Sequence, residues 1–467
     1  MSVQVTRFIV QIILARLLAP EVFGVVAVAL VTLQFLDKIT DIGTGSAIIQ
    51  RKELTERLVA SVFVLNLGLS ACLFAAMVLL SPSVARLFGT PEASPVLQVM
   101  SAAVLLTGFG NVQQALLRRR LRFRSVASIT TGSALANAVV AIPAAALGAG
   151  VWALVGGHLA LALTASLGAH FASGWRPRFA FDKVGLLSLR SYSLNLTLFN
   201  LVNFALRNSD KLIVGRFLGA RALGIYTIAD RILQYPLTTL QNSLSQVLFP
   251  ALSRTQSDVP ALQRAVLRAC GSMAIITFPA MAGLAAVAEP FTLALLGEQW
   301  KDAIPLIMVL APAGAWASIS LITGMLFQAL GRTRLLLALA VVMNGILVLV
   351  FLAAAQYGLF QVAAGFAGAA LLLSAPVNAI ALRLIGLGLS DLAEVLWSTT
   401  FASIVMAVVV AVTDRMVLSA AVGSSLLRLM LGVLLGVFVY GAMIFLLRPT
   451  GLADVYRVLG LHSRLPE

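Results

Sequence analysis

Long apolar segments separated by short polar connections run through the whole chain. Residues 60–80 and 335–355 are typical, because each is long and apolar enough to cross a bilayer as a helix of about 20 residues. The pattern predicts fourteen membrane spans, near residues 3–19, 22–48, 58–80, 95–117, 126–147, 151–172, 190–214, 222–250, 265–288, 303–330, 334–355, 360–384, 396–413 and 426–447. A water-soluble core would not need so many apolar runs, so we expect an all-α, polytopic membrane protein.

The order of the segments repeats in the second half of the chain. Residues 16–24 (RLLAPEVFG) return as residues 216–224 (RFLGARALG), with Arg, Leu and Gly in corresponding places. Weaker matches pair 87–89 with 295–297, 114–116 with 328–330, and 150–152 with 358–360. An internal repeat in so apolar a chain points to a transporter, because alternating access is built by rocking one repeat against another.

The repeats also predict how the chain is organised. Six spans in each repeat give both copies the same orientation, so we expect two parallel lobes related by an axis along the membrane normal. The polar, basic connection after residue 173 is typical of a linker. We predict an N-terminal lobe over 1–175, a C-terminal lobe over 188–385, two additional spans over 396–447 and a tail over 448–467.

The distribution of charged residues predicts how the chain is oriented in the membrane. Hydrophobic residues make up 60% of the chain and charged residues 11%, too few charges to cover a soluble protein of this length. The net charge is +15, and the basic residues fall in every second connection, which predicts that both termini are cytoplasmic. The connection Arg118–Arg124, with Leu121 and Phe123 interleaved, is expected to set topology and touch anionic headgroups. Recruitment of an anionic, lipid-linked substrate there is the alternative. We expect no nucleic-acid partner.

Polar residues inside the spans gather on the opening helices of each repeat. Their spacing of three, four and seven residues places each set on one helical face. The sets are Gln34, Asp37, Lys38 and Asp41 in the second span; Asn200, Asn203, Arg207, Asp210 and Lys211 in the seventh; and Asp230, Gln234, Thr238, Gln241 and Ser245 in the eighth. Arg231 lies beside the last set, and the first span contains Arg7 and Gln11. Ionisable groups in a membrane are costly and by default mark a pathway or a site.

Two interpretations of these faces remain open. Four half-polar helices favour a water-filled cavity between the lobes, and the cations among them exceed the carboxylates by one, which weakly favours a phosphate-bearing cargo. Alternatively, oppositely charged side chains pair between helices, or reach the interface from the span ends. The carboxylates Asp37, Asp41, Asp210 and Asp230 are candidates for coupling transport to Na⁺ or H⁺.

Catalytic and metal-binding patterns are not found. The chain contains three histidines and two cysteines, without nucleophile, phosphate-loop or metal-ligand spacing. Cys72 and Cys270 lie in apolar spans and are expected to be small buried hydrophobes. We therefore predict a protein that is not an enzyme and that needs no cofactor or metal.

Eight segments, in this order, carry a resemblance to a known family: ILARLLAPEVFG (13–24), DIGTGSAIIQRKELT (41–55), NVQQALLRRRLRF (111–123), GVWALV (150–155), SDKLIVGRFLGARALGIYTIADRI (209–232), LFPALSR (248–254), LLGEQWKDAIPLI (295–307) and ALGRTRLLL (329–337). With them the chain resembles the polysaccharide-exporter (Wzx-type) branch of the multidrug/oligosaccharidyl-lipid/polysaccharide exporter superfamily. Members usually have about twenty more residues before the first segment, forming the front of a full-length span. That difference leaves the role of Arg7 open.

The resemblance implies a V-shaped, two-lobed flippase of the bacterial inner membrane. Its cargo would be oligosaccharide units linked to undecaprenyl pyrophosphate, for lipopolysaccharide or exopolysaccharide synthesis. It also implies that cations in the cavity meet the pyrophosphate; the matching residues are Lys38, Arg207, Lys211, Arg231 and Arg7. Partners would be membrane lipids, a polysaccharide polymerase and a chain-length regulator.

Other functions remain to be distinguished. A drug/cation antiporter of the same fold would favour acidic over basic residues in its cavity. A membrane-embedded polysaccharide polymerase or ligase typically carries a large outward loop, and no connection here is long enough. A scaffold of a polysaccharide assembly complex would leave the charges inside the spans hard to explain.

Overall fold

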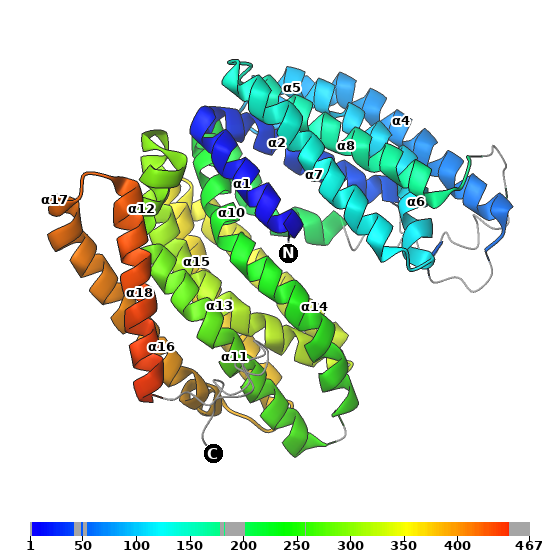
Figure 1. Ribbon diagram of the computed structural model, residues 1–467. Coiled ribbons are helices and arrows are strands. Elements are labelled where there is room, and N and C mark those ends of the chain that lie inside the picture. The colour runs from blue at the N-terminus through cyan, green and yellow to red at the C-terminus, as the bar shows by residue number, and fades with distance from the viewer. Residues whose placement is uncertain are drawn as a thin grey trace. The chain divides into compact units, whose positions relative to one another are not determined.

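The computed structural model describes residues 2–41, 48–49, 54–177, 182, 201–256 and 258–447 (Figure 1). All regular structure within these ranges is helical, which confirms the predicted all-α class. Contacts divide the chain into two compact units, Met1–Thr227 and Ile228–Glu467. The predicted lobe boundary, between residues 175 and 188, falls largely outside the described residues and stays a prediction.

The first unit contains most of the helices of the first repeat. They are α1 (Ser2–Leu17), α2 (Pro20–Asp41), α4 (Glu56–Leu87), α5 (Ala93–Met100), α6 (Ala102–Arg119), α7 (Phe123–Ala146) and α8 (Val151–Ser173). The unit also includes the first part of α10 (Ser209–Arg254). This long helix is interrupted at Gly219, whose φ of 80° and ψ of −177° are not helical. A glycine adopts that conformation at little steric cost.

The second unit contains the rest of α10 and the following helices. They are α11 (Val259–Ala286), α12 (Ala288–Phe291), a π-helical turn (Thr292–Leu296), a 3₁₀ turn (Glu298–Ala303), α13 (Ile304–Ala329), α14 (Thr333–Ala354), α15 (Leu359–Arg383), α16 (Leu389–Thr413), a second π-helical turn (Asp414–Leu418), α17 (Ser419–Ala421) and α18 (Ser425–Leu447). The π-helical turns continue α12 and α16, respectively.

Twelve helical segments in the described part of the chain are long and apolar enough to cross a membrane. The predicted fourteen is therefore an approximate count. Two of the predicted spans are not counted separately. Helix α1 has 16 residues, which is short for a span. The predicted span 190–214 lies largely outside the described residues, and the two helices of α10 form one apolar segment across Gly219.

Small residues let the helices of the first unit approach closely. A Cβ built on Gly157 of α8 would lie 2.7 Å from the Cβ of Ala141 on α7, and one on Gly110 of α6 would lie 2.8 Å from the Oγ of Ser166 on α8. Van der Waals packing of this kind associates helices in lipid, where no hydrophobic driving force separates protein from solvent. The α6, α7 and α8 helices, which run side by side in Figure 1, are held by these contacts.

The second unit has a larger apolar core with hydrogen bonds inside it. Cys270 is fully buried there among α11, α13 and α16 side chains, as predicted, whereas Cys72 on α4 of the first unit is exposed. The expectation of burial was therefore wrong for Cys72, because the sequence pattern does not show which side of α4 faces outward. The Oγ1 of Thr323 donates to Asn378 (2.7 Å), which links α13 to α15.

The last two long helices, α16 and α18, are fastened to this unit at two depths. Near one end, Arg428 makes two hydrogen bonds to the buried carboxylate of Asp414 (2.8 and 3.0 Å) and lies 3.6 Å from Glu289. Farther along α18, the hydroxyl of Tyr440 donates to the carbonyl of Ile275 on α11 (2.8 Å). The predicted additional spans are thus an integral part of the second unit.

Candidate functional site

The polar residues of α2 lie in two different environments. Gln34 and Lys38 are exposed, whereas Asp37 is half-buried and accepts a hydrogen bond from the Oγ1 of Thr107 on α6 (3.2 Å). Adjacent residues on a helix point about 100° apart, so Asp37 and Lys38 cannot share one environment. Asp41 ends α2, and its side chain is outside the description.

A second cationic segment lies against this part of α2. The rings of Phe35 on α2 and Phe204 pack with centroids 6.1 Å apart. Lys38 follows the first ring by three residues, and Arg207 follows the second by three, so each cation is about one helical turn from the contact. Both cations are exposed, as is Asn203. Asn200 falls outside the described residues.

Asp210 has a bonding partner that the sequence did not reveal. Its carboxylate accepts a hydrogen bond from the hydroxyl of Tyr226 (3.1 Å), which is almost fully buried. The two residues lie on opposite sides of the break at Gly219, so the bond ties the two helices of α10 together. Lys211, next in the chain, is half-buried.

The remaining predicted site residues lie apart from these groups in the sequence. Asp230 and Arg231 on α10 are half-buried and Gln234 is exposed, all in the second unit. The side chain of Gln241 is not among those described, and Arg7 on α1 is exposed. Lys38 and Arg207 thus each lie about one helical turn from the same aromatic contact. A cavity between the lobes stays a prediction.

The strongest structural trace of the repeat is a crossing of α2 and α10 within the first unit. A Cβ on Gly24 would overlap the carbonyl of Ala220, and a Cβ on Gly224 would overlap the carbonyl of Pro20. Gly24 corresponds to Gly224 in the repeat, and Pro20 corresponds to Ala220, at an offset of 200 residues. The two contacts are therefore equivalent. Beside them, Arg221 donates to Glu21 (2.7 Å).

Glu21 and Arg221 lie within the repeated segment, and the sequence pattern assigns them no role. The signal that would have revealed them is the opposite charge at positions 21 and 221, which correspond in the two repeats. A pair of equivalent residues lies near the local symmetry axis, and opposite charges there attract instead of repelling. Their ion pair confirms the register of the match between 16–24 and 216–224.

The weaker match of 114–116 with 328–330 is in the wrong register. Helices α6 and α13 end with the same hydrogen bonds: Leu121 to Arg118 and Arg122 to Leu117 in one, Gly331 to Gln328 and Arg332 to Phe327 in the other. These bonds align the helix ends at an offset of 210, not 214. Leu121 is thereby equivalent to Gly331, and both have a positive φ (54° and 69°).

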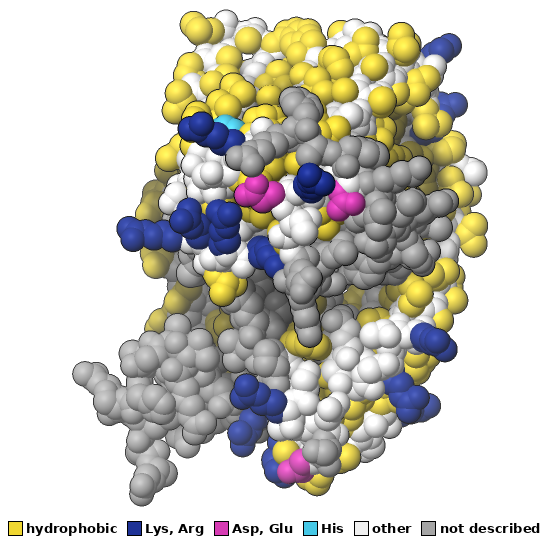
Figure 2. All heavy atoms as spheres, turned by 90° about the vertical axis from the view of Figure 1, so that its right-hand side faces the viewer, with side chains coloured by type: hydrophobic (Ala, Val, Ile, Leu, Met, Phe, Trp, Pro, Cys, Tyr) yellow, Lys and Arg dark blue, Asp and Glu magenta, His cyan; other side chains and the backbone are white. Residues whose placement is uncertain are grey.

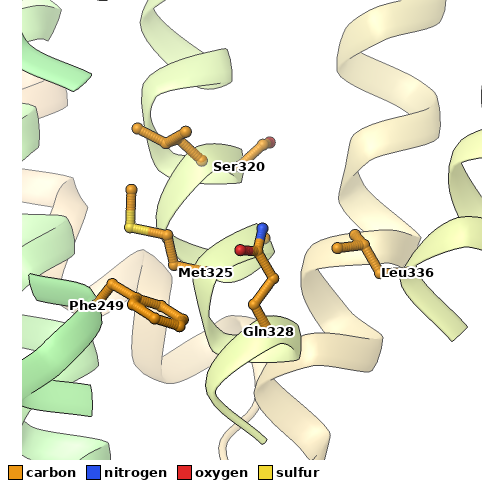
Figure 3. Close-up of a pocket in the computed structure, with 7 residues that line it drawn as sticks. Phe249, Ser320, Met325, Gln328 and Leu336 are labelled. Atoms are coloured by element: carbon orange, nitrogen blue, oxygen red, sulfur yellow. The ribbon is translucent and has the colours of Figure 1, made fainter. Parts of the chain in front are cut away.

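A pocket of about 500 Å³ opens in the second unit (Figure 3). Its wall is formed by Phe249 of α10, Leu336 of α14 and one side of α13. Figure 3 shows the amide of Gln328 projecting from α13 in the space bounded by Phe249, Met325 and Leu336, with Ser320 farther along the same helix. An aromatic ring with amide and hydroxyl groups suits a ligand that is partly polar. No pattern in the sequence points to this pocket.

Among the described residues, no group of three or more His, Cys, Asp and Glu side chains is arranged to hold a metal ion. The polar chemistry of the chain lies instead on the helices named above. A polytopic helical membrane protein with charged groups on its opening helices is the class that this fold and site define.

Known structures and relatives agree with that class. Over 98% of this chain and 97% of its own, the lipid II flippase MurJ in an inward closed conformation superimposes with a TM-score of 0.77 at 13% identity. An inward-facing multidrug resistance transporter of the MATE family, of the MOP superfamily, gives 0.63 at 20% identity over 84% of this chain and 96% of its own. At these identities the likeness establishes the fold.

Comparison of sequences adds the family. The succinoglycan biosynthesis transport protein ExoT of Rhizobium meliloti (strain 1021) is 33% identical over 65% of this chain and 62% of its own. The lipopolysaccharide biosynthesis protein WzxC of Escherichia coli (strain K12) is 28% identical over 68% of this chain and 65% of its own. The aligned part thus spans less than two thirds of either relative. Residues 13–305 match the family described as polysaccharide biosynthesis protein, and the chain belongs to that family. The predicted resemblance is confirmed.

Proposed function

We propose that this protein is a flippase that moves oligosaccharide units linked to undecaprenyl pyrophosphate across the bacterial inner membrane by alternating access. The observation that carries the proposal is that two exposed cations, Lys38 and Arg207, each follow by about one helical turn a ring of the contact between Phe35 and Phe204. Exposed cations on membrane-spanning helices are costly unless they meet water or an anion. A pyrophosphate is an anion that two such groups bind together.

Other cations extend the same site in the proposal. Lys211 and Arg231 would contact the diphosphate at other stages of transport, and Arg7, which corresponds to Arg207 in the repeat, is a further candidate. The polyprenyl chain would stay in lipid. In the proposed topology, with both termini cytoplasmic, the crossing at Gly24 and Gly224 lies at the extracytoplasmic end of α2. Release of cargo on that side requires this contact to separate.

Coupling to Na⁺ or H⁺ through Asp37, Asp41, Asp210 or Asp230 is part of the proposal. Two of these carboxylates accept hydrogen bonds from hydroxyl groups, Asp37 from Thr107 and Asp210 from Tyr226. A carboxylate is an acceptor only, whereas its protonated form also donates, so protonation would rearrange both bonds. Transport that still depends on an ion gradient after all four are replaced would refute this part.

The other functions have less support. A drug/cation antiporter shares the fold, but it would not need exposed Lys38 and Arg207 on its opening helices. A polymerase or ligase would need a catalytic constellation, and ExoT, which resembles this chain, is named a transport protein. We therefore propose a transporter that is not an enzyme and that works beside a polysaccharide polymerase and a chain-length regulator.

The test is the location of the lipid-linked oligosaccharide in cells that lack the protein. We expect completed units to accumulate on the cytoplasmic leaflet, as measured by lipid mass spectrometry with a sidedness assay. Wild type relieves the accumulation, Lys38→Ala and Arg207→Ala do not, and Arg415→Ala, which removes an exposed arginine of the second unit, serves as the matched control. Completed units already on the outer leaflet would show that flipping needs another protein.

A further inference from the structure

The turn between α6 and α7 combines charge with exposed apolar side chains. Five arginines lie between residues 118 and 124, and no acidic residue occurs from 111 to 131. Leu121 and Phe123, interleaved with them, are 71% and 61% exposed. Because α6 ends at Arg119 and α7 begins at Phe123, and both are candidate spans, the turn lies where the chain leaves the membrane.

Three of the arginines are fixed by backbone carbonyls of neighbouring segments. Arg120 donates to Ser173 (2.8 Å) and Arg122 to Ala172 (3.1 Å) at the end of α8, while Arg119 donates to Ile48 (2.5 Å). Carbonyls at the end of a helix carry partial negative charge, which attracts guanidinium groups. The guanidinium groups of Arg120 and Arg122, each with five N–H donors, are thereby held in place with their charge at the turn. Figure 2 shows basic side chains gathered on one face of the molecule, with hydrophobic surface nearby.

The backbone at Leu121 is strained in a way that the equivalent turn avoids. Its φ is 54°, a conformation that costs energy for any residue with a Cβ, whereas the second unit has Gly331 there. The repeat equivalent of Phe123 is Thr333, but both turns keep the Arg-x-Arg pair, 122 and 124 against 332 and 334. Of the two equivalent turns, only the one in the first unit has two exposed apolar side chains, Leu121 and Phe123. At Leu121 that side chain stands on a strained backbone.

We propose that the turn Arg118–Arg124 is a binding site for an anionic phospholipid of the leaflet that it faces. Leu121 and Phe123 enter the boundary between headgroups and acyl chains, which offsets the strain at Leu121. The exposed side chains of Arg118 and Arg124 bind the phosphate, and Arg119, Arg120 and Arg122 add to the positive field from fixed positions. The site is separate from the cations proposed for cargo, and it does not depend on the flippase assignment.

The experiment uses the full-length protein in nonionic detergent, titrated with phosphatidylglycerol or phosphatidylcholine. Thermal unfolding and native mass spectrometry measure stabilisation and bound lipid. We expect phosphatidylglycerol to bind at least roughly tenfold more weakly to Arg118→Ala/Arg124→Ala than to wild type, because two cationic contacts are lost. The matched control Arg332→Ala/Arg334→Ala, which removes two charges from the equivalent turn, should change the affinity less than threefold by the same reasoning.

A second variant separates lipid binding from folding. Leu121→Gly/Phe123→Thr gives the turn the residues of its counterpart, so we expect a higher unfolding temperature in phosphatidylcholine and weaker binding of phosphatidylglycerol. A lower unfolding temperature in phosphatidylcholine, unchanged binding in both turn variants, or equal losses in the control would overturn the proposal. So would stabilisation by farnesyl pyrophosphate but not by phosphatidylglycerol, because the turn would then receive cargo.

Discussion

Replacing Gly24 with alanine tests the crossing of α2 and α10 directly. The added Cβ would overlap the carbonyl of Ala220, which is backbone and cannot rotate away. Gly-to-Ala in a helix ordinarily stabilises by about 1 kcal/mol. Overpacking of a close contact costs about 1–3 kcal/mol, and a backbone neighbour places this case at the upper end. We expect a net loss of about 1–2 kcal/mol, combining the two effects.

The assay is thermal unfolding of the purified protein, with Gly68→Ala as the control. Gly68 lies on α4 with open space around the position of its Cβ, so only the gain in helix propensity applies. The two alanines should therefore shift the unfolding temperature in opposite directions, down for Gly24 and up for Gly68. Gly224→Ala should resemble Gly24→Ala, because the same contact is opened from the other side.

The double variant tests whether the two glycines belong to one contact. Once Gly24→Ala has separated the two backbones, Gly224→Ala should add little, so the combined loss should be smaller than the sum of the single losses. Additive losses would mean that the two glycines report separate contacts. An unfolding temperature that rises for Gly24→Ala as it does for Gly68→Ala would refute the close crossing itself.

Three further predictions concern ion pairs and a hydrogen bond. The side chains of Glu21 and Arg221 are 46% and 53% exposed, so Arg221→Glu should lower the free energy of unfolding by less than about 1 kcal/mol. The exchange Glu21→Arg/Arg221→Glu should restore that loss at low salt, as thermal unfolding in low and high salt would show. Arg428→Ala leaves the carboxylate of Asp414 buried without its cation and should cost about 3–5 kcal/mol, whereas Asp414→Asn/Arg428→Met should recover most of that loss in the same assay. Tyr440→Phe removes one hydrogen bond and should cost about 1 kcal/mol in denaturant unfolding, and no change would show that the bond does not hold α18.

The sequence was a good guide to the spans and to the first repeat match, because lipid requires long apolar helices and equivalent close contacts or turns require glycine at the same places. Gly89 and Gly297, paired from sequence alone, both have a positive φ (65° and 103°). The register near 330 was misjudged because Leu121 occupies a position where a glycine is expected, so the local signal was lost.

The polar residues were harder to place than the spans. Helical spacing puts Asp37 and Gln34 on one face, but only the neighbouring helix decides that Asp37 turns to Thr107 while Gln34 stays exposed. The partner of Asp210 is 16 residues away across a break that no spacing rule anticipates. Pairing between Glu21 and Arg221 required knowing that the repeats touch at equivalent residues.

The pairing of Asp414 with Arg428 bears on how the protein is made. Helices α16 and α18 are synthesised after the other described helices, and Asp414 and Arg428 carry opposite charges where the two helices are joined. Inserted singly, either charge would be costly in lipid. Because the two residues are only 14 positions apart, they neutralise each other as soon as the hairpin between them forms, before it reaches Glu289 on α12. The hairpin is therefore expected to enter the bilayer as one piece, and the second unit completes its packing only after synthesis has passed residue 440.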